Sequence, residues 1–348
     1  MENSIFNLSS YDYTLPPELI AQEPLEVRDS ARLLVIDRAQ SLIKKGLFSD
    51  ILTMLRPGDV LVLNNTKVIK AKLLGRKRTG AVIDVLLVKE RAPGVWEVLA
   101  NPGKRCRRGD IIIFGSGEVT AHVIDTTVSG GRVLEFSHPN ILSLLERIGQ
   151  PPLPHYIKKD LHDAQKYQTL YAAIEGAIAA PTAGFHFTLP LLDALCAKGI
   201  RIVYVTLHCG PATFRPVKTA DIREHHIDSE WIQISESAAE AINNAKKANR
   251  RIVAVGTTSI RTLESVATAS VDGRFRVRSY CGPTQLYITP GYAFKIIDAA
   301  VTNFHTPCST NLILAASFAG FDLLMAAYRF AIAENFRFFS FGDATIII

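Results

Sequence analysis

The chain has 348 residues, of which 48% are hydrophobic and 21% are charged. This composition excludes a largely disordered chain, and the length predicts roughly two domains of about 150 residues each. The net charge of +6 favours a polyanionic partner, whereas five scattered cysteines without a CxxC pair argue against disulfides and a structural zinc. The start of the chain lacks the pattern of a secretory leader, and its most apolar segment is interrupted by Asp322 and Arg329. We therefore expect a cytoplasmic protein without a membrane span.

The first part of the chain predicts α/β structure. A short helix is expected at residues 18–22, and the run RLLVID predicts a strand that begins at Arg32. The apolar run VLVLNN predicts a buried strand, and it ends in the polar residues Asn64, Asn65 and Thr66.

From residue 67 the pattern changes to short strands. Six strand-like runs follow one another with glycine-containing turns between them: AKLLGRK, AVIDVLLVKE, VWEVLAN, DIIIFG, VTAHVID and GRVLEFS. Strands at this spacing without an intervening helix predict a small β-barrel or sandwich. We expect it to be an inserted domain at residues 67–149, with residues 1–66 and 150–348 forming one discontinuous catalytic domain.

The predicted inserted domain is basic. A run of cations often does no more than solvate a surface, but two such runs on one small domain also suit binding to the backbone of RNA or DNA. Both interpretations stay open from the residues alone. The candidates for nucleic-acid contact are Arg76, Lys77, Arg78, Lys104, Arg105, Arg107 and Arg108.

After a proline-rich crossing, GQPPLPHYI, a helix is predicted at residues 163–172. The segment that follows, residues 176–187, predicts a strand and a turn built from small residues. Small residues such as Gly184 allow a ligand to approach the backbone closely, with Thr182 and His186 as polar contacts. Close packing between elements would explain the same pattern.

An apolar, β-branched strand is predicted at residues 201–207, and it delivers His208 to a loop. The segment beyond that loop carries His225, Asp228 and Glu230. Ligands of open α/β sheets bind beyond the carboxyl ends of strands, which favours these positions for chemistry. Any one of the four could be an ordinary surface or core residue, but their grouping predicts a site.

Two further strand-to-helix turns follow. The strand RIVAVG leads directly into the predicted helix GTTSIRTLES, so that Gly256, Thr257 and Thr258 lie at its start. Free N–H groups and hydroxyls at such a turn bind carboxylates or ribose hydroxyls. Asn303 and His305 precede a long apolar helical segment in the same way. Neither turn has the spacing of a Walker loop or a GxGxxG motif.

Ten motifs in order along the chain resemble one known family, the S-adenosylmethionine:tRNA ribosyltransferase-isomerases of queuosine biosynthesis. These motifs are DYTLPPELIAQEP, RLLVIDR, RPGDVLVLNNTKVIKAKLLG, PPLPHYI, YQTLYA, AAPTAGFHFT, VTLHCGPATFRPV, VGTTSIRTLES, TNFHTPCST and FRFFSFGDA. Together they run nearly from one end of the chain to the other, which makes the resemblance far more specific than any single motif.

The resemblance implies a fold and a reaction. The fold is an α/β main domain with a mixed β-sheet flanked by helices, plus an inserted small β-barrel. The reaction transfers the ribosyl unit of S-adenosylmethionine to 7-aminomethyl-7-deazaguanine at the tRNA wobble position and isomerises it, giving epoxyqueuosine, adenine and methionine. The resemblance also implies a transferase that acts as a monomer on the anticodon stem-loop, with no permanently bound cofactor and no metal.

Site residues follow from the same resemblance. Proton transfers are expected from His208, His225, Asp228 and Glu230. The residues expected to frame S-adenosylmethionine are Thr182, Gly184, His186, Gly256, Thr257, Thr258, Arg261, Asn303 and His305.

Some positions depart from the family pattern. The family usually reads GxGTF where this chain has Ala212 in place of the second glycine, and HxMHSE where this chain has Asp228 in place of a histidine. Its FHLPxSTL and GDAM motifs stand here as FHTPCSTN and GDAT. The polar residues around these positions are otherwise kept, which favours an active enzyme.

Three other functions remain as alternatives. An S-adenosylmethionine-dependent RNA methyltransferase would yield methylated RNA, but the expected glycine-rich motif after a first strand is missing. A non-catalytic RNA-binding protein would use only the basic domain and consume no small molecule. A metal hydrolase built on His225, His226 and Asp228 is disfavoured because adjacent histidines on a loop lack the usual ligand spacing.

Overall fold

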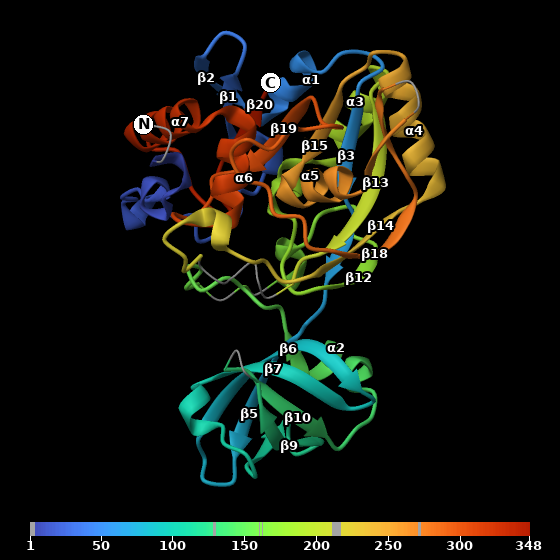
Figure 1. The fold of residues 1–348 in the computed structure, drawn as a ribbon. Helices are drawn as coiled ribbons and strands as arrows, with labels where there is room; N and C mark the ends of the chain where they lie inside the picture. Colours follow the sequence, from blue (N-terminus) through green and yellow to red (C-terminus); the bar gives the residue numbers. More distant parts are fainter. Residues whose placement is uncertain (1–3, 128–129, 160, 162, 211–216, 271–272) are drawn as a thin grey trace. The chain divides into compact units, whose positions relative to one another are not determined.

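The computed structural model describes residues 4–127, 130–159, 161, 163–210, 217–270 and 273–348. The chain forms two compact units, each built from segments that are separated in sequence (Figure 1). The main unit comprises Met1–Lys67, His155–Ile174 and Ala180–Ile348, and the second unit comprises Val68–Pro154 and Glu175–Ala179.

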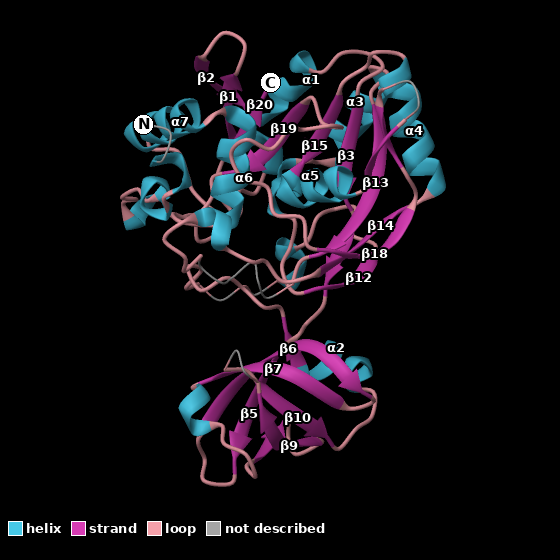
Figure 2. Ribbon diagram, viewed as in Figure 1, coloured by secondary structure: helices cyan, strands magenta, loops and turns pink. Residues whose placement is uncertain are grey.

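The main unit is organised around a nine-stranded mixed sheet (Figure 2). In order across the sheet the strands are β18 (Tyr280–Thr284), β14 (Glu230–Ile234), β13 (Arg201–His208), β3 (Val60–Asn64), β15 (Ile252–Val255), β19 (Ala299–Asn303), β20 (Ala344–Ile347), β1 (Arg32–Asp37) and β2 (Leu42–Leu47). The four central strands β13, β3, β15 and β19 are parallel, and β20 is parallel to β1. The other neighbouring pairs are antiparallel.

Burial of the central strands explains why helices cover both faces of this sheet. Every residue of β3, β15 and β19 is buried, as expected for parallel strands whose sequences are apolar up to their polar carboxyl ends. Alternate residues such as Leu61, Leu63 and Val253 pack with leucines of α3, and α5 contacts the same central strands. The helices are α1 (Ile51–Met54), α3 (Leu189–Ala197), α4 (Glu236–Lys247), α5 (Gly256–Ser265), α6 (Thr310–Ala319) and α7 (Phe321–Ala333).

The second unit is a closed antiparallel β-barrel. Its strands in order are β5 (Lys72–Lys77), β6 (Val82–Ala92), β7 (Val95–Asn101), β10 (Arg132–Phe136), β9 (Val119–Thr126) and β8 (Ile111–Phe114), and β8 pairs with β5 to close the barrel. Burial alternates along β5 and β9, so that every second side chain enters the core. Gly75 is required inside, since a Cβ there would lie 2.4 Å from Ile112 Cγ2. The unit also contains α2 (Leu145–Ile148) and β11 (Gly149–Gln150).

Two-stranded sheets are formed by β4 (Thr66–Val68) with β12 (Ile174–Ala177) and by β16 (Ala267–Ala269) with β17 (Phe275–Val277). The nine-stranded mixed sheet with its helices and the closed barrel confirm the mixed α/β class with a small β-barrel that the sequence predicts.

The prediction of a helix at residues 163–172 is wrong. Only one 3-10 turn forms there, Ala164–Tyr167, and the Asp163 side chain caps it by accepting from the Gln165 N–H. The chain then bends and turns through residues 168–171, where Tyr167 and Tyr171 pack into the main unit, Tyr171 against Gly184. Tertiary packing thus overrides the local preference for a helix.

Among the described residues, no single helix is long and apolar enough to cross a membrane. The helices α6 and α7 meet the length and composition criteria only as a pair, and this pair is bent by 113° at Gly320.

A buried carboxylate fixes the carboxyl-terminal segment of the chain. Asp343 is 1% exposed and accepts hydrogen bonds from the backbone N–H groups of Arg32 and Arg337, at 3.0 and 2.8 Å. The Arg32 guanidinium donates to the same carboxylate at 3.1 Å. One side chain therefore holds the start of β1 next to the segment that leads into β20.

We predict that Asp343→Ala lowers the free energy of unfolding of the main unit by about 3 kcal/mol, because it leaves a partly buried guanidinium and two backbone donors without their acceptor. Denaturant unfolding followed by Trp231 fluorescence in a Trp96→Phe background reports on this unit alone. The control is Glu334→Ala, which removes an exposed ion pair with Lys45 and is expected to cost less than about 1 kcal/mol. Equal effects of the two changes would contradict this account.

Candidate active site

The carboxyl ends of four parallel strands meet at one edge of the main sheet, and the candidate site lies there. His208 is the last residue of β13, and its Nδ1 lies 2.8 Å from Thr66 Oγ1, just beyond the end of β3. The imidazole also stacks on Trp231 of the neighbouring strand β14, with ring centroids 5.1 Å apart and planes 12° from parallel. Burial lowers the pKa of His208, so that the neutral imidazole dominates at pH 7.

A buried ion pair lies beside this histidine. Glu230, the first residue of β14, is 6% exposed and forms a salt bridge with Arg261 of α5. Its Oε1 accepts from the Gly210 N–H at 2.9 Å. The guanidinium of Arg261 also donates through Nε to the Leu286 carbonyl at 3.0 Å. The pair therefore ties together the loop after β13, helix α5 and the segment after β18.

Helix α5 presents buried polar atoms that lack a partner. Arg261 Nη2, Thr258 Oγ1 and Ser259 Oγ are buried and have no hydrogen-bond partner among the described residues. Buried donors of this kind are rare in folded proteins unless a ligand or water satisfies them. Three of them within two turns of one helix make the start of α5 a candidate for binding the polar groups of a small ligand.

The start of α5 has the geometry that the sequence predicts for a strand-to-helix turn. Gly256 has a φ of +83°, which is strained for any residue with a side chain. A Cβ at this position would lie 3.7 Å from the Cβ of Ala183, so the turn Thr182–His186 lies beside it. The structure thus brings two segments expected to bind S-adenosylmethionine into contact.

His186 and Asn303 form a buried pair in that region. Asn303 donates through Nδ2 to the carbonyls of Phe339 and Ser340, at 2.9 and 3.3 Å. Its Oδ1 therefore faces His186 Nε2, 3.1 Å away, and that nitrogen must carry the proton. Burial lowers the pKa of His186 to about 4, so the imidazole is neutral. These two residues hold the end of β19 in place, next to residues 339–340.

His305 is engaged with its surroundings in a similar way. Its Nε2 lies 2.9 Å from Thr302 Oγ1, and its backbone N–H donates to the Tyr328 hydroxyl at 2.8 Å. The Tyr13 hydroxyl donates to its carbonyl. Burial lowers the pKa of His305 to about 3. No contact between His305 and the Glu230–Arg261 pair is found in the described part of the chain.

Two of the expected catalytic residues, His225 and Asp228, lie on the segment that precedes β14. His225 packs edge-on against Tyr287 at 5.5 Å, and its pKa is lowered by burial and by the neighbouring His226. Asp228 is exposed to solvent. Across the described ranges, no group of three or more His, Cys, Asp or Glu side chains is arranged to hold a metal ion.

Gly184, which was expected to let a ligand approach the backbone, lies against the side chains of Tyr171 and Thr169. A Cβ on Gly184 would lie 2.0 Å from the Tyr171 hydroxyl and 2.8 Å from Thr169 Cγ2. Close packing of these side chains therefore requires glycine at this position. Ala212, the departure from the family's glycine, lies outside the described residues, as do residues 211 and 213–216.

Sequence reasoning did not assign a site role to Thr66 or Trp231, which contact His208 directly. Thr66 stands in the polar run that ends a buried strand, which is the signal that could have identified it. Trp231 could have been found only from the register of β13 and β14, since it pairs with His208 across the two strands.

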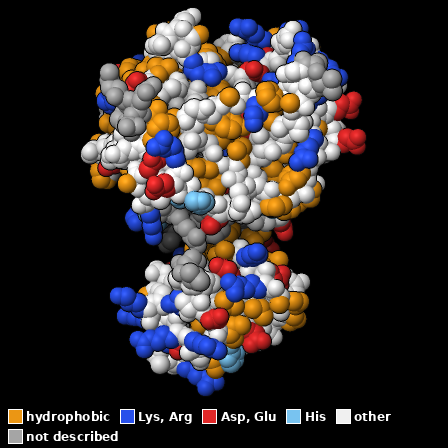
Figure 3. Space-filling model, in the orientation of Figure 1, with side chains coloured by type: hydrophobic (Ala, Val, Ile, Leu, Met, Phe, Trp, Pro, Cys, Tyr) orange, Lys and Arg blue, Asp and Glu red, His pale blue; other side chains and the backbone are white. Residues whose placement is uncertain are grey.

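The basic residues of the barrel gather near the β5–β8 contact. Lys77 on β5 forms a salt bridge of 2.8 Å with Asp110 and donates to the Arg105 carbonyl at 3.2 Å, so the two runs of cations adjoin. The remaining members are exposed: Arg76, Arg78, Lys104, Arg105, Arg107 and Arg108. Figure 3 shows Lys and Arg side chains grouped on this part of the barrel.

Comparison with known proteins gives consistent results. A family model described as "Queuosine biosynthesis protein" matches residues 8–347. A protein of Symbiobacterium thermophilum is 50% identical over 343 residues, which cover 98% of this chain and 99% of that protein. A protein of Caldanaerobacter subterraneus is 49% identical over 342 residues, with the same coverage. Both relatives are named S-adenosylmethionine:tRNA ribosyltransferase-isomerase.

A solved structure shares the architecture. The crystal structure of the S-adenosylmethionine tRNA ribosyltransferase from Thermotoga maritima matches with 36% sequence identity and a TM-score of 0.55, covering 97% of this chain and all of that one. The matching family model, the two relatives and this structure together show that the chain belongs to the queuosine biosynthesis family of S-adenosylmethionine:tRNA ribosyltransferase-isomerases.

Proposed function

We propose that this protein transfers the ribosyl moiety of S-adenosylmethionine to 7-aminomethyl-7-deazaguanine at the wobble position of tRNA and isomerises it, forming epoxyqueuosine and releasing adenine and methionine. The observation that carries the proposal is the set of buried, unpartnered donors on α5, beside the Glu230–Arg261 pair and close to the edge that holds His208, in a chain of this family. Such a site offers polar partners to a small substrate and a neutral imidazole for proton transfer.

The reaction needs a base that removes an acidic proton next to the sulfonium centre and an acid that assists the departure of adenine. His208 suits the first task because its lowered pKa keeps the imidazole neutral at pH 7. Its contact with Thr66 fixes the ring orientation, and the stack on Trp231 restricts its rotation. His225 and Asp228 remain candidates for the second task.

Glu230 suits a different role within the proposed mechanism. Both of its oxygens are occupied, one by the Gly210 N–H and the other by Arg261. We therefore propose that Glu230 positions Arg261 and adds negative charge near the sulfonium cation. Cys209 is not a nucleophile in this scheme, because burial and the neighbouring Glu230 raise the pKa of its thiol and keep it protonated.

S-adenosylmethionine would bind along the start of α5. The free Nη2 of Arg261 can donate to the carboxylate of the methionine moiety, and the hydroxyls of Thr258 and Ser259 can bind ribose hydroxyls. The same edge would also include Gly256, Thr257 and Thr182. The residues that would hold this edge in position through packing and hydrogen bonds are Gly184, His186, Asn303 and His305. The substrate brings its own reactive sulfonium, so we propose that no permanently bound cofactor and no metal is needed.

The tRNA would bind through its phosphates. The exposed arginines and lysines of the barrel supply cations that release counterions from the RNA backbone. We expect the anticodon stem-loop to be the part recognised, with a monomeric enzyme acting in the cytoplasm.

Adenine release that depends on tRNA carrying 7-aminomethyl-7-deazaguanine tests the proposed function directly. Formation of S-adenosylhomocysteine would instead identify a methyltransferase, and tRNA binding without turnover a non-catalytic RNA-binding protein.

We predict that His208→Ala lowers kcat for adenine release by a factor of about 10² to 10⁴ and changes the KM for S-adenosylmethionine much less. A base must be unprotonated, so the wild-type kcat is expected to fall as pH drops through the lowered pKa of His208, below the usual value of 6.5. The variant should lack this acidic limb. The control His122→Ala changes an exposed histidine on β9 of the barrel. A pH profile of His208→Ala identical to that of the wild type would remove His208 from the mechanism.

Arg261→Lys should raise the KM for S-adenosylmethionine by roughly 10- to 100-fold, because a lysine cannot serve Glu230, the Leu286 carbonyl and a substrate carboxylate together. The measurement is adenine release as a function of S-adenosylmethionine concentration. Arg278→Lys, at an exposed position, is the matched control. An unchanged KM in Arg261→Lys would place the methionine carboxylate elsewhere.

Replacing Arg105, Arg107 and Arg108 by glutamine should weaken tRNA affinity by at least about tenfold and lower its log–log dependence on salt by up to about 3. The matched control removes three other cations of the barrel, Lys89, Arg91 and Arg147. Filter binding or fluorescence anisotropy at several salt concentrations measures both quantities. If the two triple variants behave alike, the proposed barrel surface has no special part in RNA binding.

A further inference from the structure

A second basic site lies on the main unit at the edge of the sheet opposite to the candidate active site. It is a hollow of about 410 Å³ formed where α4 ends, where β15 and β19 begin, and where β17 crosses. We call it the edge pocket. Its lining residues are Asn243, Lys246, Lys247, Asn249, Arg250, Arg251, Gly273, Arg274, Phe275, Arg276 and Asp298.

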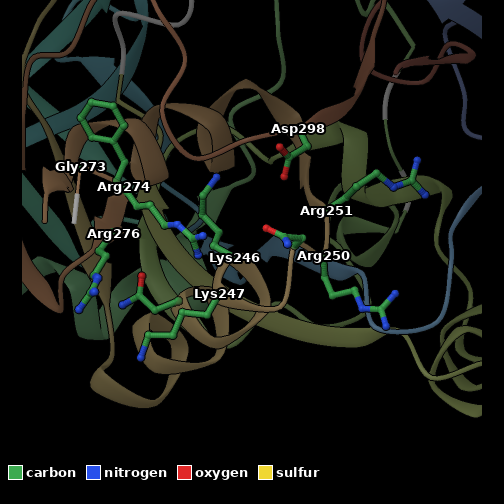
Figure 4. A pocket seen from close by; sticks show the side chains of 11 residues that line it. Lys246, Lys247, Arg250, Arg251, Gly273, Arg274, Arg276 and Asp298 are labelled. Atoms are coloured by element: carbon green, nitrogen blue, oxygen red, sulfur yellow. The ribbon is translucent and has the colours of Figure 1, made fainter.

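Cations dominate the edge pocket. Six of its lining residues are Lys or Arg, and Asp298 is the one acidic residue among them. In Figure 4 the side chains of Lys246, Lys247, Arg274 and Arg276 lie on one side of the hollow, and those of Arg250 and Arg251 lie on the other. Four of these cations belong to the run KKANRR at residues 246–251, and the fold adds Arg274 and Arg276 from a second segment of the chain.

Internal contacts account for only part of this charge. Arg251 is paired with Asp59 at 2.6 Å, and Lys246 donates to the Ile296 carbonyl at 2.9 Å. Within the part of the chain that the structure describes, Lys247 and Arg250 form no ion pair. Asp298 uses one carboxylate oxygen to accept from the Ile252 N–H at 2.7 Å. The hollow therefore keeps an excess of positive charge that an anionic ligand can neutralise.

The lining favours the phosphates of an RNA over a small ligand. Pockets for small molecules are mostly apolar with a few buried polar groups, whereas Lys247, Arg250 and Arg274 are exposed. Lysines and arginines on an open surface suit a phosphodiester backbone, and the exposed Phe275 adds a ring on which a base can stack.

We propose that the edge pocket binds phosphodiester groups of the tRNA substrate outside its anticodon hairpin. This inference rests on the proposed function, which places the wobble nucleotide at the opposite edge. The strand β15 joins the two edges, but all of its residues are buried, so an RNA can reach both edges only around the outside of the helices that cover the sheet. This path is longer than the strand itself, which favours the arms of a full-length tRNA over its short anticodon hairpin.

The test compares full-length tRNA with its isolated anticodon hairpin. The double variant Lys247→Gln with Arg250→Gln should bind full-length tRNA about tenfold more weakly, with the log–log salt dependence lowered by about 1 to 2. Its affinity for the hairpin should equal that of the wild type. The matched control, Lys44→Gln with Arg329→Gln, removes the same charge from exposed positions of β2 and α7 and should change neither affinity.

Two results would overturn the inference. The first is unchanged affinity of the double variant for full-length tRNA, and the second is an equal loss for tRNA and hairpin. If the first result comes with a loss of inorganic tripolyphosphate binding in the double variant, the pocket is assigned to a small phosphorylated ligand.

Adenine release by the wild type separates this inference from the proposed function. If the wild type releases adenine in the presence of modified tRNA and the double variant binds tRNA normally, only the edge pocket loses its assignment. If the wild type releases no adenine, the proposed function fails, whatever the binding data show.

Discussion

The buried carboxylate of Glu230 is the contact on which the candidate site depends. It joins three segments that are far apart in sequence: the loop at Gly210, helix α5 through Arg261, and the segment at Leu286. Because a buried carboxylate without its cation is costly, this pair can form only when all three segments are in place. The same contact leaves one arm of Arg261 without a partner and so keeps a donor ready for substrate.

The central strands impose this arrangement. Strands that are buried on both faces need helices on both sides, and parallel strands bring their carboxyl ends to one edge. Polar groups beyond the strand ends are outside the hydrogen-bonded ladder of the sheet, so they are free to contact other segments or a ligand. His208, Thr66 and the start of α5 meet there for this reason, while His186 and Asn303 use their polar atoms to fix the supporting loop.

The positive charge of the chain is divided between two surfaces. One lies on the barrel, where Lys77 joins two runs of cations through Asp110. The other is the edge pocket of the main unit, whose cations come from the run KKANRR between α4 and β15 and from the start of β17. Only the fold places Arg274 and Arg276 beside that run. Both surfaces suit a long polyanion better than a small substrate.

The sequence by itself determined the fold class, the six barrel strands and the family. A two-residue hydrophobic period, strongly apolar strands and motifs in a fixed order can all be read directly from the order of the residues. The sequence also placed polar residues at the correct strand ends. Only the tertiary structure decided which of them are in contact. Glu230 pairs with Arg261, and His208 contacts Thr66 and Trp231. His225 packs against Tyr287. The tertiary structure also replaced the helix expected at residues 163–172 by a single 3-10 turn followed by a bend and a turn. These outcomes depend on strand register and on packing between distant segments, and neither is encoded in local spacing.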